Sequence, residues 1–401
     1  MDAGNVGSTR RAVRRARRGV LVAVACTWLA AACTSDGDAP PVTAPTPPIE
    51  EPAGATAAGR DVELVLPPRT DLDPDIAEGI SDRLRSLSED LPDGVDAVRV
   101  RLPDEPVFVA DLLELVAARG AGLACVLGPD VVGVADRTAL RHGATTVCAL
   151  PATLPEPDED GGFQPTPAVR VDVPVTELGV LVGTAARTAA LTAVSQVQPD
   201  ADDLDPDADD LGPDDLDPEA EAPTAPAVEV PRVGLVLLGD ELPATRLREG
   251  ILTGLAGVEA VEAEDADATA LEALEAVLAA GVQVVIVDGG PGAAEVVSAT
   301  AGRSAIVAPV DLLTGELRTE VVLGYRLRWE RVVRVLLDSF AGAGRLEAPV
   351  LLGVGDDVLE VEVGEDQPEV LTALEEVQAQ LATRDDPRAP LLDEGPPDVG
   401  P

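Results

Sequence analysis

From residue 61 onward, short runs of apolar residues alternate with segments whose apolar residues have helical spacing. Val62–Leu66 is an apolar run, and the segment after it places Ile76, Ile80, Leu84 and Leu87 on one helical face. The alternation of strand-like and helix-like segments continues to residue 150. Such a pattern predicts a parallel sheet with helices on both of its faces.

A long segment rich in small residues, 175–195, separates this half from a second one. From Val230 the alternation returns and continues to residue 383. We therefore predict an α/β fold of two Rossmann-like lobes with parallel sheets, joined by a hinge. Open α/β sheets bind ligands beyond the carboxyl ends of their strands, and clefts between domains are common small-molecule sites. The sequence thus predicts a binding cleft between the lobes.

The first 32 residues are organised like a secretory signal. Six arginines precede an apolar run, Val20–Ala32, which is shorter than the roughly 20 residues that a membrane-spanning helix needs. The run ends in the sequence AAAC, which resembles a bacterial lipobox with Cys33 as its cysteine. We predict that Cys33 is acylated and becomes the first residue of the mature protein. The sequence AVAC, which ends at Cys26, is a weaker rival lipobox. Ordinary signal cleavage beside an incidental cysteine is the alternative to acylation.

Composition and periodicity together divide the chain into eight segments. They are a lipoprotein signal peptide (1–32), a flexible tether (33–59), an N-terminal α/β lobe (60–174), a crossover helix (175–195), an acidic disordered insertion (196–229), a C-terminal α/β lobe (230–323), a return segment with the terminal helix (324–383) and a disordered tail (384–401).

The acidic insertion contains a short repeat. Between Asp202 and Pro218 a D-D-L-x-P unit occurs three times. Closely spaced aspartates could bind calcium, but frequent prolines and repelling charges favour disorder. The segment also has no glycine at the turn position of a calcium loop and no closing glutamate.

Charge and residue inventory exclude several classes of function. The chain has 29 basic and 73 acidic residues, for a formal net charge of −44, which excludes nucleic-acid binding through phosphate contacts. His142 is the single histidine, and its surroundings predict a loop residue at a helix end. Because the chain offers no evident nucleophile–base pair or His/Cys metal site, we expect no enzyme activity, metal or cofactor.

Two cysteines remain in the part predicted to fold. Cys125 and Cys148 each lie in a short strand-like run, with one helix-length segment between them. Consecutive strands of an α/β sheet are often neighbours, so a disulfide is plausible in an exported protein. Two buried free thiols are the alternative.

The order of segments resembles that of a known family. Residues 175–191, 232–255, 281–297 and 304–340 resemble segments of the basic-membrane-protein branch of the type I periplasmic binding proteins. The members of this branch are lipoprotein receptors for nucleosides and similar solutes, and they supply ABC importers. The chain departs from the family's ligand motifs in two places: the loop after the first strand, PPRTDLDPD, has no aromatic residue, and Gly324 occupies a position where the family has a hydroxyl residue.

Ten residues at predicted strand ends are candidate ligand contacts. They are Asp71, Gly128, Asp130, Asp240, Glu241, Asp288, Gly289, Gly290, Asp311 and Tyr325. The resemblance implies that Asp311 binds ligand hydroxyls, and a carboxylate can accept two such donors. Each aspartate could instead cap a helix or lie in a solvated loop. Gly289 and Gly290, with Gly292, could cradle a phosphate at a helix N-terminus or form a tight turn.

Together these features predict a lipid-anchored solute-binding protein on the outer face of the cell membrane. Its partners would be a small polar ligand, such as a nucleoside or sugar, and an ABC permease. The alternative is a degenerate receptor-like envelope lipoprotein that acts in interaction or sensing without transport.

Overall fold

The computed structural model describes residues 59–128, 131–152, 165–197, 230–239, 242–263, 268–313, 320–346 and 349–383. Several features predicted from the sequence lie outside these residues: the signal segment, Cys33, most of the tether, the acidic repeat, the C-terminal tail, Asp130, Asp240 and Glu241.

The first lobe is a six-stranded parallel sheet with the order β2-β1-β3-β4-β5-β11. Its strands are β1 (Asp61–Val65), β2 (Ala97–Arg101), β3 (Leu123–Leu127), β4 (Thr146–Leu150), β5 (Val169–Asp172) and β11 (Val350–Leu351). One face is covered by α2 (Pro74–Ser86) and α9 (Trp329–Ala343), and the other by α3 (Val107–Ala118) and α4 (Val132–Arg141). The two helix layers follow from strands that are apolar on both faces.

The second lobe repeats this plan with the order β7-β6-β8-β9-β10-β12. Its strands are β6 (Arg232–Val236), β7 (Glu259–Glu262), β8 (Val284–Val287), β9 (Ala305–Pro309), β10 (Val321–Leu327) and β12 (Leu359–Val363). One face is covered by α5 (Val175–Val197), α6 (Leu242–Gly254) and α10 (Pro368–Ala382), and the other by α7 (Ala270–Ala279) and α8 (Ala293–Thr300).

One strand differs from the all-parallel expectation. β12 is antiparallel to β10, with Leu327 opposite Leu359. The reason is the path of the chain. β10 ends where the chain leaves for α9 in the first lobe, and β12 begins where it returns from β11. Both ends therefore lie on the side of the sheet nearer the first lobe, and the two strands must run in opposite directions.

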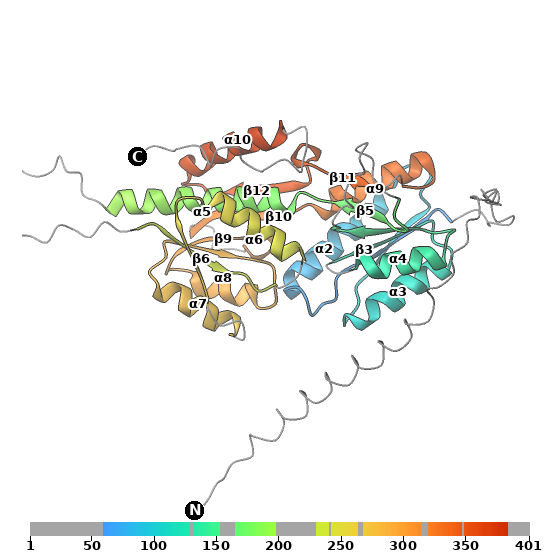
Figure 1. Ribbon diagram of the computed structural model, residues 1–401, viewed down its shortest axis with the longest axis horizontal. Helices are drawn as coiled ribbons and strands as arrows, with labels where there is room; N and C mark the ends of the chain where they lie inside the picture. Colours follow the sequence, from blue (N-terminus) through green and yellow to red (C-terminus); the bar gives the residue numbers. More distant parts are fainter. Residues whose placement is uncertain are drawn as a thin grey trace, which may run out of the picture. The chain divides into compact units, whose positions relative to one another are not determined.

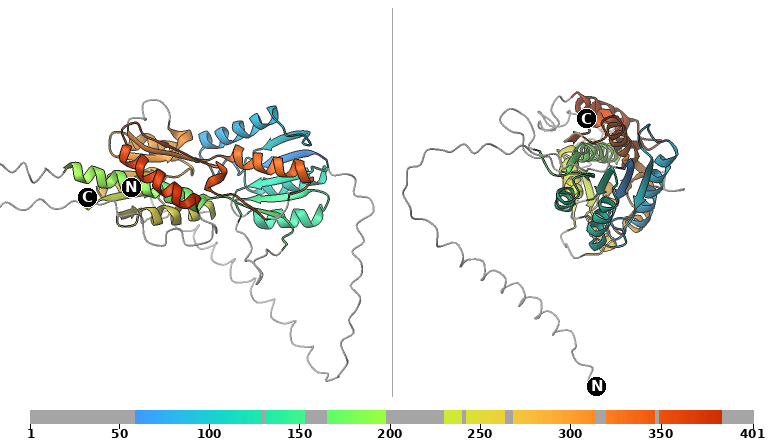
Figure 2. Two further views of the ribbon diagram at one scale, coloured as in Figure 1. Left: turned by 90° about the horizontal axis from the view of Figure 1, so that it is seen from above. Right: turned by 90° about the vertical axis from the view of Figure 1, so that its right-hand side faces the viewer.

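The chain passes between the lobes at three places: between β5 and α5, between β10 and α9, and between β11 and β12. Figures 1 and 2 show the two sheets with their helix layers, and α10 beside α5 on the second lobe. The short 3₁₀ segments Val310–Leu312 and Val354–Asp356 lie after β9 and before β12.

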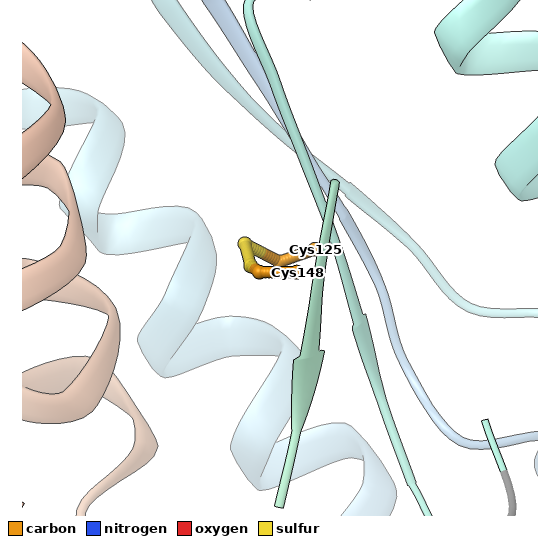
Figure 3. The surroundings of a disulfide bond; sticks show 2 residues. All are labelled: Cys125 and Cys148. Atoms are coloured by element: carbon orange, nitrogen blue, oxygen red, sulfur yellow. A yellow bond between two sulfur atoms is a disulfide. The ribbon is translucent and has the colours of Figure 1, made fainter. Parts of the chain in front are cut away.

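Cys125 and Cys148 form a disulfide between β3 and β4 (Figure 3). Their Cα atoms are 4.5 Å apart because parallel pairing of the two strands places the residues directly opposite each other. Both side chains are fully buried, in the core that α2 and α9 cover. Of the two alternatives left open by the sequence, the structure has the disulfide.

Helix α5 packs against α6 through glycines on both helices. A Cβ atom added at Gly179 or Gly183 of α5 would lie 2.3 or 2.2 Å from a backbone oxygen of α6, and one at Gly250 of α6 would lie 2.1 Å from a backbone oxygen of α5. By length and composition α5 could cross a membrane, but 67% of its apolar window is buried in the protein. We interpret it as the core helix of the second lobe.

This close approach predicts that Gly183→Ala destabilises the protein by about 1–3 kcal/mol, because the new methyl group must push the two helices apart. Alanine has the higher helix propensity, by about 1 kcal/mol, so any loss of stability reports helix packing. Chemical unfolding followed by circular dichroism measures the difference.

The matched control is Gly342→Ala in α9, where an added Cβ meets no atom within 4 Å. This variant is expected to be neutral or slightly stabilised. Equal effects of the two substitutions would contradict the packing argument.

Candidate functional site

A pocket of about 420 Å³ lies where the carboxyl ends of both sheets meet. The first lobe contributes the loops after β1, β3 and β4, one face of α2 and the start of α9. The second lobe contributes the loops after β6, β8 and β9, the end of β10 and the starts of α5 and α6. In each sheet the chain adds its second strand (β2 or β7) on one side of the first strand and its third strand (β3 or β8) on the other side. Open α/β sheets form their binding crevice at such a switch point. Its volume falls within the range of about 300–1,000 Å³ that is common for small-molecule sites.

The structure brings together every described residue that the sequence proposed as a ligand contact. Seven of them line the pocket: Asp71, Gly128, Asp288, Gly289, Gly290, Asp311 and Tyr325. Sequence reasoning missed the two arginines of the pocket wall, Arg83 and Arg326, and the side chain of Trp329. The helical spacing that places Ile76 and Ile80 on the buried face of α2 also places Arg83 there, and this signal was available in the sequence.

Asp311 forms an ion pair with Arg83 across the two lobes. The Arg83 guanidinium donates to both carboxylate oxygens, at 2.6 and 2.9 Å. Burial alone would lower the pKa of Arg83, but the hydrogen bonds and charge of Asp311, with Glu330 and Glu360, outweigh it and raise the pKa above its ordinary value. Arg83 is therefore a permanent cation. Both oxygens of Asp311, which the sequence analysis assigned to ligand hydroxyls, are engaged by the protein itself.

Asp73 links the lobes through hydrogen bonds to two helix N-termini. One carboxylate oxygen accepts from the backbone N–H of Asp75 in α2, and the other accepts from the N–H of Ala294 in α8 of the second lobe, both at 3.1 Å. The backbone N–H of Asp73 donates to the carbonyl of Gly289. Only 3% of Asp73 is exposed. A carboxylate is favourable at a helix N-terminus, and this one occupies two of them.

A third link joins β5 to α6. Arg246 donates to the Asp172 carboxylate at 2.6 Å and, more weakly, to the carbonyl of Val173. The side chains of this pair are partly buried, with exposures of 20% and 23%. Polar contacts within the protein thus hold the two lobes together on more than one side of the pocket.

The other polar groups of the second lobe are also engaged. The Asp288 carboxylate accepts hydrogen bonds from the backbone N–H groups of Leu238, Gly239 and Gly290, at 2.9–3.1 Å. The Tyr325 hydroxyl donates to the carbonyl of Val287 at 2.7 Å. Burial, and then the charge of Asp288, raise the pKa of Tyr325 well above its ordinary value, so the phenol stays neutral.

The rest of the wall is predominantly apolar. Its side chains include Leu72, Ile76, Ile80, Leu238, Leu247 and Trp329. Among the described lining residues there is no serine, threonine, cysteine or histidine. The described part of the pocket therefore offers surfaces for binding and no nucleophile with an adjacent base.

The bidentate pair predicts energetic coupling between the lobes. Arg83→Met and Asp311→Asn should each destabilise the protein by about 1–3 kcal/mol, because each leaves a partly buried partner unsatisfied. The double variant should lose less than the sum of the two, which a double-mutant cycle of urea unfolding measures. The exposed pair Arg303–Glu275 is the control, and its coupling should be far smaller. Additive effects at Arg83 and Asp311 would contradict the coupling.

No protein-family model matches the chain, and a search of curated proteins found no match. Among solved structures, a solute-binding protein of an ABC transporter system from Conexibacter woesei is similar over 80% of this chain and 96% of its own, at 16% identity and a TM-score of 0.51. A second such protein, from Aeropyrum pernix, is similar over 80% of this chain and 86% of its own, at 16% identity and a TM-score of 0.52.

A transcriptional activator of the comK gene from Bacillus halodurans is similar over 81% of this chain and 98% of its own, at 12% identity and a TM-score of 0.52. At these identities the likeness concerns the fold alone. Two α/β lobes with mainly parallel six-stranded sheets, crossed by the chain three times, make this the type I periplasmic-binding-protein fold, as the sequence predicts.

Proposed function

We propose that this protein is an extracytoplasmic binding protein that captures a small molecule in the cleft between its lobes. The main support for this proposal is the pocket of about 420 Å³ at the carboxyl ends of both sheets. Hinge closure of two domains around a ligand is a characteristic motion of such bodies, and three short chain crossings provide the hinge. A pocket without a nucleophile–base pair among its described residues supports binding over catalysis.

We further propose that the protein is anchored by lipid at Cys33 and delivers its ligand to an ABC importer. The lipobox-like sequence and the proline-rich segment after it support the anchor. Similarity to solute-binding proteins of ABC transporter systems, in fold alone, supports the importer. Membership of the basic-membrane-protein branch is a finer proposal that rests on the resembling sequence segments, and that membership would imply a nucleoside or sugar as the ligand.

A receptor-like protein without transport is the second candidate. The observation in its favour is that Asp73, Arg83 and Arg246 join the lobes through polar contacts within the protein, with no ligand needed to complete them. A binding protein must still admit its ligand, whereas a degenerate receptor need not. Ligand binding therefore separates the two candidates.

Binding in the cleft predicts that at least one compound in a library of sugars, nucleosides, amino acids and apolar molecules raises the melting temperature of the mature chain. At saturation a rise of about 4 °C or more is expected. Ala244→Phe places a ring at the pocket wall and should abolish the rise. Glu249→Phe, at an exposed position of the same helix, is the control and should preserve it. A library without any hit would favour the degenerate receptor.

Acylation predicts that Cys33→Ser moves the exported protein from the detergent phase to the aqueous phase of a Triton X-114 partition, because the acyl chains supply the membrane affinity. Cys26→Ser, at the other cysteine of the signal segment, should leave the partition unchanged. Detergent-phase recovery of the Cys33→Ser protein would contradict the anchor.

A further inference from the structure

We propose that the cleft takes a small, predominantly apolar ligand, and that Trp329 forms part of its binding surface. This inference rests on the proposed binding function and departs from the nucleoside or sugar that the sequence resemblance implies. Three properties of the pocket support this inference. They are the hydrogen bonds that its polar side chains already make within the protein, the apolar side chains of its wall and the position of the Trp329 ring.

The polar side chains of the described pocket wall are already engaged within the protein. Asp311 is held by Arg83, and the Asp288 carboxylate accepts three backbone N–H groups. The guanidinium of Arg326 donates to Glu360 at 2.8 Å, and the Tyr325 hydroxyl donates to a backbone carbonyl. A ligand hydroxyl could bond only to the capacity that these bonds leave, which is the remaining lone pairs of the carboxylates and the remaining N–H donors of the arginines.

Incomplete hydrogen bonding is unfavourable for a polyhydroxylated ligand. Each buried polar group without a partner costs about 1–3 kcal/mol, so several hydroxyls would offset the whole free energy of binding. Asp71, which is half-buried at the wall, accepts a hydrogen bond from Thr70 on one oxygen and keeps its other oxygen for a ligand donor. A sugar needs several such partners.

The wall favours an apolar ligand because most of its side chains are themselves apolar. Ile76 and Ile80 of α2 face the pocket from the first lobe, and Leu238 and Leu247 from the second. Burial of apolar surface against them gains about 25 cal/mol per Å². Such a ligand would contact both lobes without disturbing the bonds of Asp73 and Arg83, which join the lobes independently of it.

Trp329 adds a flat apolar surface with one polar atom. It is half-buried, lines the pocket and begins α9 directly after the second chain crossing. Among the described residues, none accepts a hydrogen bond from its indole N–H. The indole ring thus adds apolar surface against which the hydrocarbon body of a ligand can pack.

The sequence also supplies a probe of this site. The chain has two tryptophans, and Trp28 lies in the signal segment, so Trp329 is the only one in residues 33–401. Titration of the mature chain with N-phenyl-1-naphthylamine, an apolar dye, should quench the emission of Trp329 and sensitise that of the dye. D-glucose, D-ribose and inosine should neither change this emission nor displace the dye.

A substitution in the wall tests where the dye binds. Leu72→Ala removes part of the apolar surface and should weaken dye binding about threefold to tenfold. Leu140→Ala, at a side chain that is 74% exposed and outside the pocket, should leave it unchanged. Unliganded melting temperatures of both variants distinguish lost contacts from lost folding.

The outcomes separate this inference from the function on which it rests. If inosine or a sugar binds and the dye does not, the apolar class is wrong and the binding function stands. If Leu72→Ala and Leu140→Ala bind the dye equally, the dye lies elsewhere and the assignment to the cleft is wrong. If neither class of compound binds, both proposals fail.

Discussion

The buried carboxylate of Asp73 is the contact that places α2 against both lobes. It caps α2, which covers the first sheet, and α8, which covers the second. Because one rigid group satisfies backbone donors of two helices, the start of α2 is held against the second lobe. Ile76, Ile80 and Arg83 follow on the same helix and line the pocket from that position. Placement of α2 therefore determines the pocket wall.

Once α2 is placed, the charges around the pocket can be paired without a ligand. Arg83 reaches Asp311, and Arg326 lies between Asp311 and Glu360, at 3.8 and 2.6 Å. The chain carries a formal net charge of −44, yet Asp311 and Glu360 in this region both have arginine partners. Partly buried carboxylates need cationic or hydrogen-bonding partners, since an unpaired buried charge is strongly unfavourable. The pairing engages the charged groups of the wall with each other, and the rest of the wall is predominantly apolar.

Much of the fold could be predicted from the sequence because periodicity is a local property. Each strand and helix is encoded by its own segment, and strand ends bring loops together by topology, so Asp71, Asp288 and Asp311 could be placed at one pocket. Their partners could not be predicted in the same way. Arg83 lies 228 residues from Asp311 in the chain, and only the folded lobes bring them together. The antiparallel strand β12 was missed for a similar reason, since its direction depends on the route of the chain through the other lobe.

Asp73 and Asp288 show that the local sequence does not predict which partner an aspartate has in the folded protein. Asp73 precedes a proline at the start of α2, which is the signature of a helix cap, but its second hydrogen bond to α8 belongs to the tertiary structure. Asp288 follows a buried strand, as a ligand contact would, yet it orders the loop after β6. A strand-end aspartate thus has the same sequence signal whether it binds a ligand or a backbone turn, and only its partners distinguish the two.

The contacts between the lobes also govern how a ligand gains its affinity. Opening the cleft exchanges a few intramolecular hydrogen bonds for bonds to water, at a net cost of about 0.5–1.5 kcal/mol each. If the ligand enters only the open form, its association rate is reduced by the fraction of molecules that are open. A ligand that then restores these bonds on closure recovers their free energy and adds its own apolar burial. A polar ligand that competes for Asp311 or Asp288 would recover less, because it replaces existing bonds. The polar links between the lobes and the apolar wall are therefore two parts of one arrangement, in which the protein supplies the hydrogen bonds and the ligand supplies the buried surface.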